Sequence, residues 1–138
     1  MNVEAVLDTN VLVYSVSCLE DDREKRDRAQ SLMRNPFGVS GQILQEFYVN
    51  VTRKIKKPLP PELALEWLEQ LEQQPCVPVD ATLVKNGIVT SERYRISYWD
   101  GAILAAAEAL GAETLYTEDL NHGQLYGSVR VINPFRPD

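Results

Sequence analysis

The sequence predicts an α/β protein in which a mostly parallel sheet of about five strands is flanked by helices. Short apolar runs such as Val3 to Leu7 and Val129 to Ile132 have the length of buried strands. Segments with helical spacing of apolar residues separate these runs, and parallel strands need such long crossovers. No internal repeat or Gly/Ser linker interrupts the 138 residues. We therefore expect a single domain over residues 1–138.

In the first half of the chain, polar residues mark where strands end and helices begin. Asp8 follows the strand from Val3 to Leu7 and can cap a helix that reaches Ser17. A charge-rich segment with a narrow apolar stripe predicts a second helix, which Asn35-Pro36 would end. Ser40 can cap a third helix after a short strand at Val39. The two further helices are expected over Asp21 to Arg34 and from Ser40 to about Arg53.

The second half repeats the alternation of helix and strand. Pro61 suits the first position of a helix, Asp80 and Ser97 are predicted caps, and Gly111 is a helix terminator. The expected helices are Pro61 to Gln74, Ala81 to Tyr94 and Ser97 to Gly111, and the expected strands are Cys76 to Val79, Thr114 to Thr117 and Val129 to Ile132.

Composition excludes several classes of protein. Apolar residues make up 44% and charged residues 25% of the chain, which is ordinary for a globular protein and argues against disorder. The longest uncharged stretch, Asn35 to Gln45, is too short to span a bilayer, so no membrane association and a cytoplasmic location are expected. Cys18 and Cys76 have no metal-site spacing and are predicted to be free, buried thiols.

The net charge of −6 and the isoelectric point near 4.8 bear on partners. An acidic balance argues against non-specific coating of nucleic acid, which requires a basic face. It allows a locally basic groove beside an acidic site. The densest basic run contains Arg53, Lys54, Lys56 and Lys57, and it could equally favour a helix C-terminus or contact phosphate.

Four carboxylates occupy unusual settings in the sequence. Three are each the only charged residue in a long uncharged stretch, and the fourth follows a predicted strand: Asp8, Glu46, Asp100 and Asp119. Each has a purely structural interpretation, as a helix cap, a solvent-facing residue, a capping-box acid after Ser97, or a turn acid. An unpaired carboxylate among apolar neighbours is costly, so a shared cation explains the set better.

The chemistry of this acidic set indicates a metal and a reaction. Oxygen ligands without a His or Cys cluster favour Mg²⁺ or Mn²⁺ over zinc. One or two such ions activate water and neutralise the charge that develops on a scissile phosphate, so phosphoryl transfer is the expected chemistry. His122, the only histidine, is interpreted as a solvated loop residue, and Trp67 and Trp99 are expected to pack in the core.

At these residues the sequence resembles the PIN-domain ribonucleases, and in particular the VapC-like toxins of type II toxin–antitoxin pairs. The resemblance covers nearly the whole chain and lies in the order and spacing of five short motifs. They are Asp8-Thr9-Asn10, Glu46 in a mid-chain helix, Tyr98-Trp99-Asp100, Leu115-Tyr116-Thr117-Glu118-Asp119, and Asn133-Pro134-Phe135.

The resemblance implies a three-layer PIN-like fold and a metal-dependent endoribonuclease that hydrolyses RNA phosphodiester bonds. It implies Asp8, Glu46, Asp100 and Asp119 as the catalytic set, with Asp8, Asp100 and Asp119 as metal ligands and Asn10 and Thr117 as polar supports. It further implies a homodimer and a cognate antitoxin protein as partner. Glu118 is an additional acid beside Asp119, and the T-x-D position favours Asp119.

Two other functions remain open at the level of sequence. A non-catalytic PIN-like binding module would share the fold without the activity. A phosphatase of the haloacid-dehalogenase type would use Asp8 as a covalent nucleophile, but its second acid is Asn10 here, which removes the expected general acid.

Overall fold

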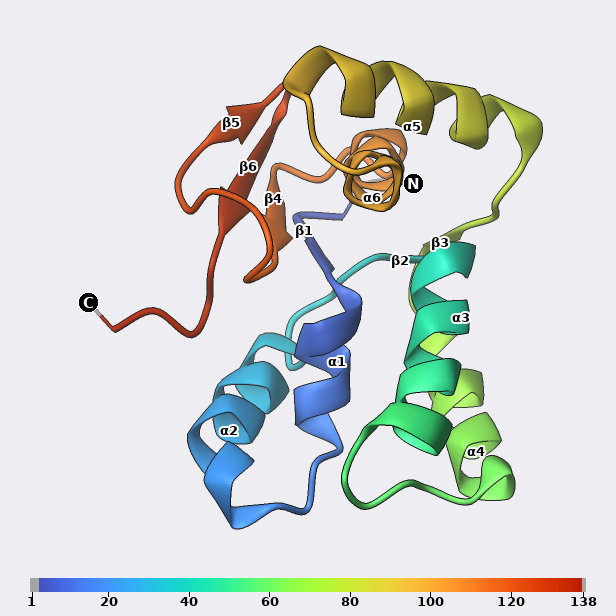
Figure 1. Ribbon diagram of the computed structural model, residues 1–138, viewed down its shortest axis with the longest axis vertical. Coiled ribbons are helices and arrows are strands. Elements are labelled where there is room, and N and C mark those ends of the chain that lie inside the picture. The colour runs from blue at the N-terminus through green and yellow to red at the C-terminus, as the bar shows by residue number, and fades with distance from the viewer. Residues whose placement is uncertain (1–2, 138) are drawn as a thin grey trace.

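The structure is a computed structural model that describes residues 3–137. Its central sheet has the strand order β1-β4-β6-β5, in which β1, β4 and β6 are parallel and β5 is antiparallel to β6 (Figure 1). These strands span Ala5–Leu7 (β1), Thr114–Tyr116 (β4), Leu125–Tyr126 (β5) and Val129–Ile132 (β6).

A second pair of parallel strands extends the sheet on the side of β1. Val39–Ser40 (β2) pairs with Cys76–Val77 (β3), and a single parallel bridge joins Gly38 to Val6 of β1. The segment that leads into β2 therefore lies beside β1. The strand β2, which directly precedes the next helix along the chain, is thus anchored beside the same sheet.

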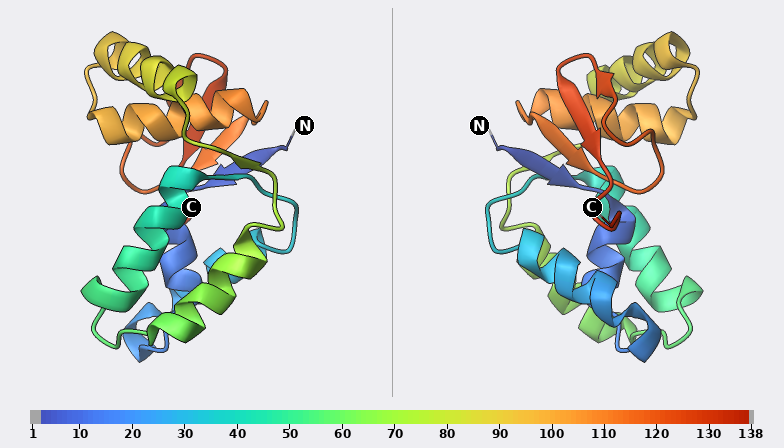
Figure 2. Two further views of the ribbon diagram at one scale, coloured as in Figure 1. Left: turned by 90° about the vertical axis from the view of Figure 1, so that its right-hand side faces the viewer. Right: turned by 90° about the vertical axis from the view of Figure 1, so that its left-hand side faces the viewer.

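Over residues 3–137, six α-helices surround the strands in two groups (Figures 1 and 2). Helix α6 packs on β2, β4 and β6 and is covered by α5, whereas α1 contacts α2 and α3, and α3 contacts α4. The helices span Thr9–Ser15 (α1), Arg23–Leu32 (α2), Gly41–Val49 (α3), Pro61–Leu71 (α4), Ala81–Tyr94 (α5) and Tyr98–Ala109 (α6).

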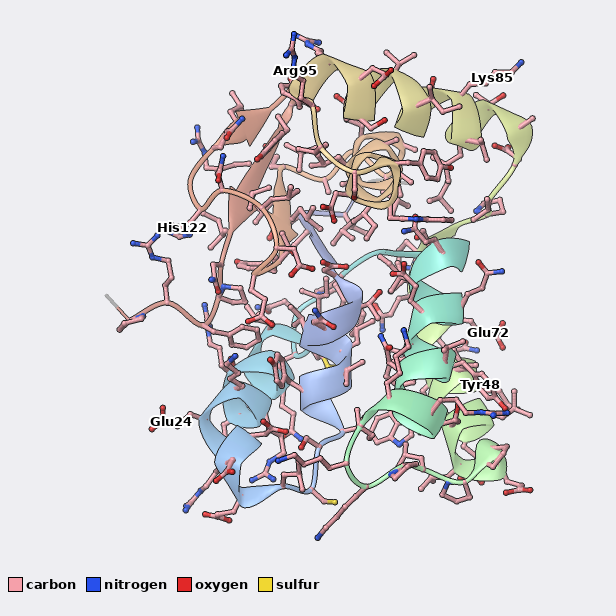
Figure 3. All side chains as sticks on the ribbon, in the orientation of Figure 1. Glu24, Tyr48, Glu72, Lys85, Arg95 and His122 are labelled. Atoms are coloured by element: carbon pink, nitrogen blue, oxygen red, sulfur yellow. The ribbon has the colours of Figure 1, made fainter. Side chains whose placement is uncertain are left out.

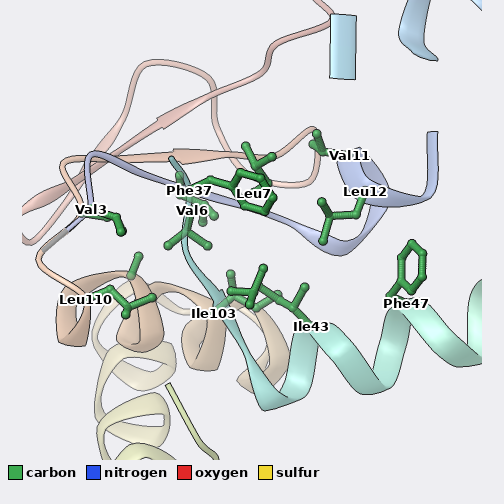
Figure 4. Packing of buried hydrophobic residues seen from close by; sticks show 14 of the residues in the cluster. Val3, Val6, Leu7, Val11, Leu12, Phe37, Ile43, Phe47, Ile103 and Leu110 are labelled. Atoms are coloured by element: carbon green, nitrogen blue, oxygen red, sulfur yellow. The ribbon is translucent and has the colours of Figure 1, made fainter. Parts of the chain in front are cut away.

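The main core forms between these helices and the sheet (Figure 4). Val6 and Leu7 of β1 are buried together with Ile43 and Phe47 of α3 and Ile103 of α6. Burial of side chains of this size stabilises the fold by about 1.5–3 kcal/mol each. The core thereby fixes the position of α3 and α6 against the end of β1.

Most of the predicted elements are confirmed, and the predicted caps explain where the helices begin. The side chains of Ser40, Asp80 and Ser97 accept hydrogen bonds from backbone N–H groups in the first turns of α3, α5 and α6. Several helices are shorter than expected. For example, α1 ends at Ser15, and α3 passes into a π-helical turn over Asn50–Lys54. Such turns are rare and are often found at functional sites.

Two expectations about local structure were wrong or incomplete. Cys18 and Cys76 are free as predicted, but both are exposed, because Cys18 lies in the loop after α1 and β3 has an outward-facing side at Cys76. The two-residue strand β5 was not predicted, since a run so short has no detectable period.

Among the helices of residues 3–137, none has the length and apolar character that crossing a bilayer requires.

Candidate active site

The register of β1 and β4 brings two distant polar residues together at the carboxyl edge of the sheet. Leu7 pairs with Tyr116, and the Asp8 N–H donates a hydrogen bond to the Tyr116 carbonyl. Asp8 directly follows the last residue of β1, and Thr117 directly follows the last residue of β4. Ligand sites of open α/β sheets form outside this edge.

Asp8 is a buried carboxylate that is 5% exposed. The Thr9 N–H donates to Asp8 Oδ1 at 2.7 Å, and the Thr117 hydroxyl donates to Asp8 Oδ2 at 2.6 Å. Burial raises the pKa of Asp8 to about 6; these two hydrogen bonds oppose the rise, and the nearby charges of Asp119 and Glu46 add to it. Asp8 is therefore both the predicted helix cap and a member of an acidic cluster.

Glu46 enters the same site from α3. Its Oε1 accepts a 2.7 Å hydrogen bond from the Thr9 hydroxyl, and its Oε2 accepts a 3.3 Å hydrogen bond from the side-chain amide of Gln42. Gln42 also donates to the Trp99 carbonyl of α6 at 3.2 Å. The Glu46 carboxylate thus contacts α1 directly, and α6 only through Gln42, and Glu46 lines the cleft instead of facing bulk solvent.

Asp100 and Asp119 complete the acidic set from two further segments. Asp100 lies in the first turn of α6, where its backbone N–H donates to the Ser97 hydroxyl at 3.1 Å, and Asp119 follows β4. Partial burial raises the pKa of both carboxyls. Glu46 adds to the rise at Asp100, and Asp100, Glu118 and Glu46 add to it at Asp119.

The four predicted carboxylates line one open cleft of about 480 Å³. They reach it from β1, α3, α6 and the loop after β4. The cleft is also lined by Asn10 and by Lys54 of the basic run. Thr117 stands behind Asp8, where it accepts a 3.1 Å hydrogen bond from the Asp119 N–H while donating to Asp8.

Glu118 points into a different environment from its neighbour Asp119. Its Oε2 lies 3.3 Å from Lys25 Nζ, and its Oε1 accepts a 3.1 Å hydrogen bond from the Tyr14 hydroxyl. Lys25 also lies over the rings of Tyr14 and Phe135, at 4.6 Å and 5.3 Å from their centroids. The expectation that Asp119 rather than Glu118 faces the acidic cleft therefore agrees with this geometry.

The donor set of the cleft fits a hard divalent cation by its chemistry. The four candidate ligands are all carboxylates, and three of them have pKa values raised partly by the charge of another member of the set. A divalent cation relieves this repulsion. Within residues 3–137, no three metal-ligating side chains are already gathered closely enough to hold an ion, so binding requires the carboxylates to converge.

The other sequence-based candidates take varied positions. Of Arg53, Lys54, Lys56 and Lys57, Lys54 lines the cleft, and Lys57 lines a smaller neighbouring pocket of about 240 Å³. His122 is exposed at the edge of the molecule opposite α3, as expected of a loop residue (Figure 3). Its Nδ1 accepts a hydrogen bond from the Asn133 N–H at 3.0 Å.

Sequence reasoning missed three residues that shape the cleft. Thr9 and Gln42 hold Glu46, and Trp99, expected in the core, is 62% exposed and lines the cleft. The available signal was that Trp99 directly precedes the candidate ligand Asp100 in the sequence.

The fold and this site define the class of protein. The chain belongs to the PIN domain family, whose sequence model matches residues 5–127. No curated protein sequence matches the chain significantly.

Several solved structures share the fold. A toxin–antitoxin complex from Klebsiella pneumoniae is similar with a TM-score of 0.69 and 19% identity, over 97% of this chain and 100% of that one. FitAB bound to a DNA fragment is similar with a TM-score of 0.67 and 19% identity, over 97% of each chain. VapC20 of Mycobacterium tuberculosis, described as a sarcin–ricin loop cleaving toxin, is similar with a TM-score of 0.65 and 14% identity, over 84% of this chain and 90% of that one.

Proposed function

We propose that this protein is a metal-dependent endoribonuclease that hydrolyses RNA phosphodiester bonds and uses Mg²⁺ or Mn²⁺. The observation that carries the proposal is the convergence of Asp8, Glu46, Asp100 and Asp119 on one open cleft from four distant segments. Membership of the PIN domain family agrees with it. A cluster of partly buried acids without cationic partners costs stability unless a cation compensates it.

In this proposal Asp8, Asp100 and Asp119 hold the metal, and Glu46 completes the catalytic set. A divalent cation there supplies Lewis-acid activation of water and neutralises negative charge that develops on the phosphate. Thr117 orients Asp8 and Asp119, because one hydroxyl is bonded to both. Thr9 and Gln42 orient Glu46, and Asn10 offers a further polar contact in the cleft.

Two features of the cleft support a nucleic-acid substrate. The cleft is open to solvent and large enough for a phosphodiester with its flanking groups, and Lys54 provides a cation on its wall. Lysine contacts to phosphate position a strand without reading its sequence. Arg53 precedes Lys54 in the same basic run, Lys56 and Lys57 follow it, and the three residues would extend this contact beyond the cleft.

The experiment is digestion of cellular RNA by the purified protein with Mg²⁺, with Mn²⁺ and with a chelator. We expect internal cuts that need the metal and that Asp8→Asn abolishes. Thermal unfolding provides a readout besides activity, since either ion should raise the Tm of the wild type and raise that of Asp8→Asn much less. His122→Ala is the matched control, because His122 lies away from the cleft, and it should cleave like the wild type.

Two other results would replace the proposal. An absence of cleavage together with metal-independent stability would indicate a non-catalytic PIN-like binding module. Release of phosphate from small esters, with trapping of a phosphate analogue on Asp8, would indicate the phosphatase alternative. That alternative has no acid at Asn10, and both oxygens of Asp8 already accept hydrogen bonds.

We further propose that the protein acts as the toxin of a toxin–antitoxin pair, as a cytoplasmic homodimer neutralised by a cognate antitoxin. Support comes from two solved structures that share the fold, a toxin–antitoxin complex from Klebsiella pneumoniae and DNA-bound VapBC from Salmonella typhimurium. Expression without the antitoxin should arrest growth, and Asp8→Asn should relieve the arrest. Sedimentation of the purified chain tests the dimer, and a strictly monomeric chain would contradict it.

A further inference from the structure

Trp99 is a large apolar side chain that the fold leaves in solvent at the rim of the acidic cleft. It is 62% exposed, lies in the first turn of α6 and directly precedes Asp100. Trp99 is one of the residues that line the same cleft as the four carboxylates. Leaving an indole in water forgoes the free energy that its burial would provide, and aromatic side chains of this size usually dominate cores and interfaces.

The Trp99 ring packs against a neighbouring aromatic ring, and the backbone carbonyl of Trp99 accepts a hydrogen bond. The ring of Tyr98 contacts it in a T-shaped arrangement, with 5.0 Å between centroids and 75° between planes. Tyr98 in turn packs against α5, where a Cβ on Gly87 would come within 3.2 Å of its ring. The Trp99 carbonyl is fixed by Gln42. An aromatic ring that is already ordered loses little conformational entropy when a ligand stacks on it.

The remaining walls of the cleft indicate what kind of ligand would cover this ring. Lys54 offers a cation and Asn50 an amide, and the carboxylates mark the expected position of the scissile phosphate. A ring, a cation and a phosphate-directed acidic set together match a nucleotide chain, in which each base lies beside a phosphodiester. A purely apolar protein segment would leave Lys54 and the carboxylates desolvated without partners.

We propose that Trp99 is a stacking platform for one unpaired nucleobase next to the phosphodiester that the cleft cuts. The substrate is therefore single-stranded RNA or an RNA loop, because a base inside a duplex has both faces covered and cannot reach the ring. This inference rests on the proposed function and narrows its substrate. Trp99 contributes to substrate binding and to selection of unpaired sites, while the carboxylates carry out the hydrolysis.

The first experiment uses the intrinsic fluorescence of Trp99 in a chain that has two tryptophans. Trp67 lies in α4, packed against the core and away from the cleft, so Trp67→Phe isolates the signal of Trp99. In the background of Asp8→Asn, which prevents cleavage, Trp67→Phe is titrated with a single-stranded oligoribonucleotide in Mg²⁺. We expect quenching of Trp99, and the reciprocal Trp99→Phe variant, which retains Trp67, should show none.

Two matched ligands test whether the contact is made by a base. An oligoribonucleotide with abasic sites keeps the phosphates, and a fully paired duplex keeps both bases and phosphates. Both should quench Trp99 far less than the single strand does. Equal quenching by all three ligands, or none by any, would overturn the proposal.

The second experiment measures cleavage by otherwise wild-type variants. Trp99→Ala should raise KM for a single-stranded substrate by roughly 5- to 150-fold, the range expected for the loss of one base stack, with a smaller change in kcat. Trp99→Phe should recover most of the loss, because phenylalanine retains a ring. A Trp99→Ala variant with unchanged KM and a correct fold would contradict the proposal.

The two proposals fail in different ways. If the wild type cuts RNA but Trp99 does not respond to single strands, the nuclease stands and the stacking platform falls. If Trp99 is quenched by single strands but no RNA is cut, the binding site stands and the nuclease falls. A blue shift of Trp99 emission with rising protein concentration and no RNA would show that a second copy covers the ring, which would overturn the platform.

Discussion

Asp8 and Thr117 are separated by 109 positions in the sequence and are joined by a 2.6 Å hydrogen bond at the edge of the sheet. The pairing of Leu7 with Tyr116 in the preceding step of the ladder sets this contact. The same Thr117 hydroxyl accepts from the Asp119 N–H. One buried side chain, 1% exposed, therefore aligns two of the proposed metal ligands.

Removal of the Thr117 hydroxyl should affect both stability and activity. Thr117→Val keeps the shape of the side chain but leaves Asp8 Oδ2 without this donor. Because hydrogen bonds to charged groups contribute about 1.5–3 kcal/mol, we expect a loss of stability of that order at pH 7.5 in chemical unfolding. Thr117→Ser retains the hydroxyl and should keep most of the stability and cleavage. Equal behaviour of the Val and Ser variants would contradict the role assigned to this hydrogen bond.

The stability of the metal-free protein should fall as the pH rises from 4 to 7. The pKa of Asp8 is about 6 in the fold and about 3.8 in the unfolded chain, so the unfolded chain loses its proton first. The stabilisation that comes from keeping Asp8 protonated in the fold is fully present below pH 4 and is lost as the pH rises through 6. Between these values the free energy of unfolding falls by about 1.4 kcal/mol per pH unit, or about 3 kcal/mol in total.

Asp8→Asn isolates this effect from those of the other carboxylates. With a chelator present, the unfolding free energy of the variant should rise relative to that of the wild type as the pH goes from 4 to 7. Saturating Mg²⁺ should reverse the trend, because the ion binds the charged form. A difference that does not change with pH would show that the Asp8 carboxyl is not perturbed in the fold.

Glu118 and Asp119 should differ in their effect on cleavage. Asp119→Asn should reduce kcat by about 100-fold or more, the scale seen when one group that manages transition-state charge is removed. Glu118→Gln should change cleavage little, since Glu118 is paired with Lys25 and Tyr14 instead of facing the cleft. It should cost at most about 1 kcal/mol of stability, as expected for a partly exposed ion pair. The opposite ranking of the two variants would overturn the assignment of Asp119.

Lys54 should contribute to RNA affinity through phosphate. Lys54→Ala should weaken binding and reduce the slope of log K against log salt concentration by about 0.7, the value for one phosphate contact to a single strand. Lys85→Ala is the matched control, because it removes the same charge from a residue that lies outside the basic run and does not line the cleft. Equal slopes for both variants would contradict a phosphate contact at Lys54.

Much of the site could be predicted because it depends on local features of the chain. The order of strands and helices follows from apolar spacing, and Asp8, Ser40, Asp80 and Ser97 mark helix starts because their side chains satisfy backbone N–H groups nearby. A carboxylate directly after a parallel strand falls at the ligand-binding edge of the sheet by the geometry of the fold. These signals require no knowledge of which elements touch.

The partners of each side chain depended instead on contacts between distant segments. Thr9 holds Glu46 because α1 packs on α3, and Glu118 turns from the cleft because Lys25 of α2 and Tyr14 of α1 lie on its other side. Trp99 and both cysteines are exposed although their residue types are usually buried, since no element within residues 3–137 covers them. The sequence by itself determined which residues could carry chemistry and the segments that hold them. Only the tertiary structure decided which way those side chains face, because direction and burial depend on how helices and strands pack.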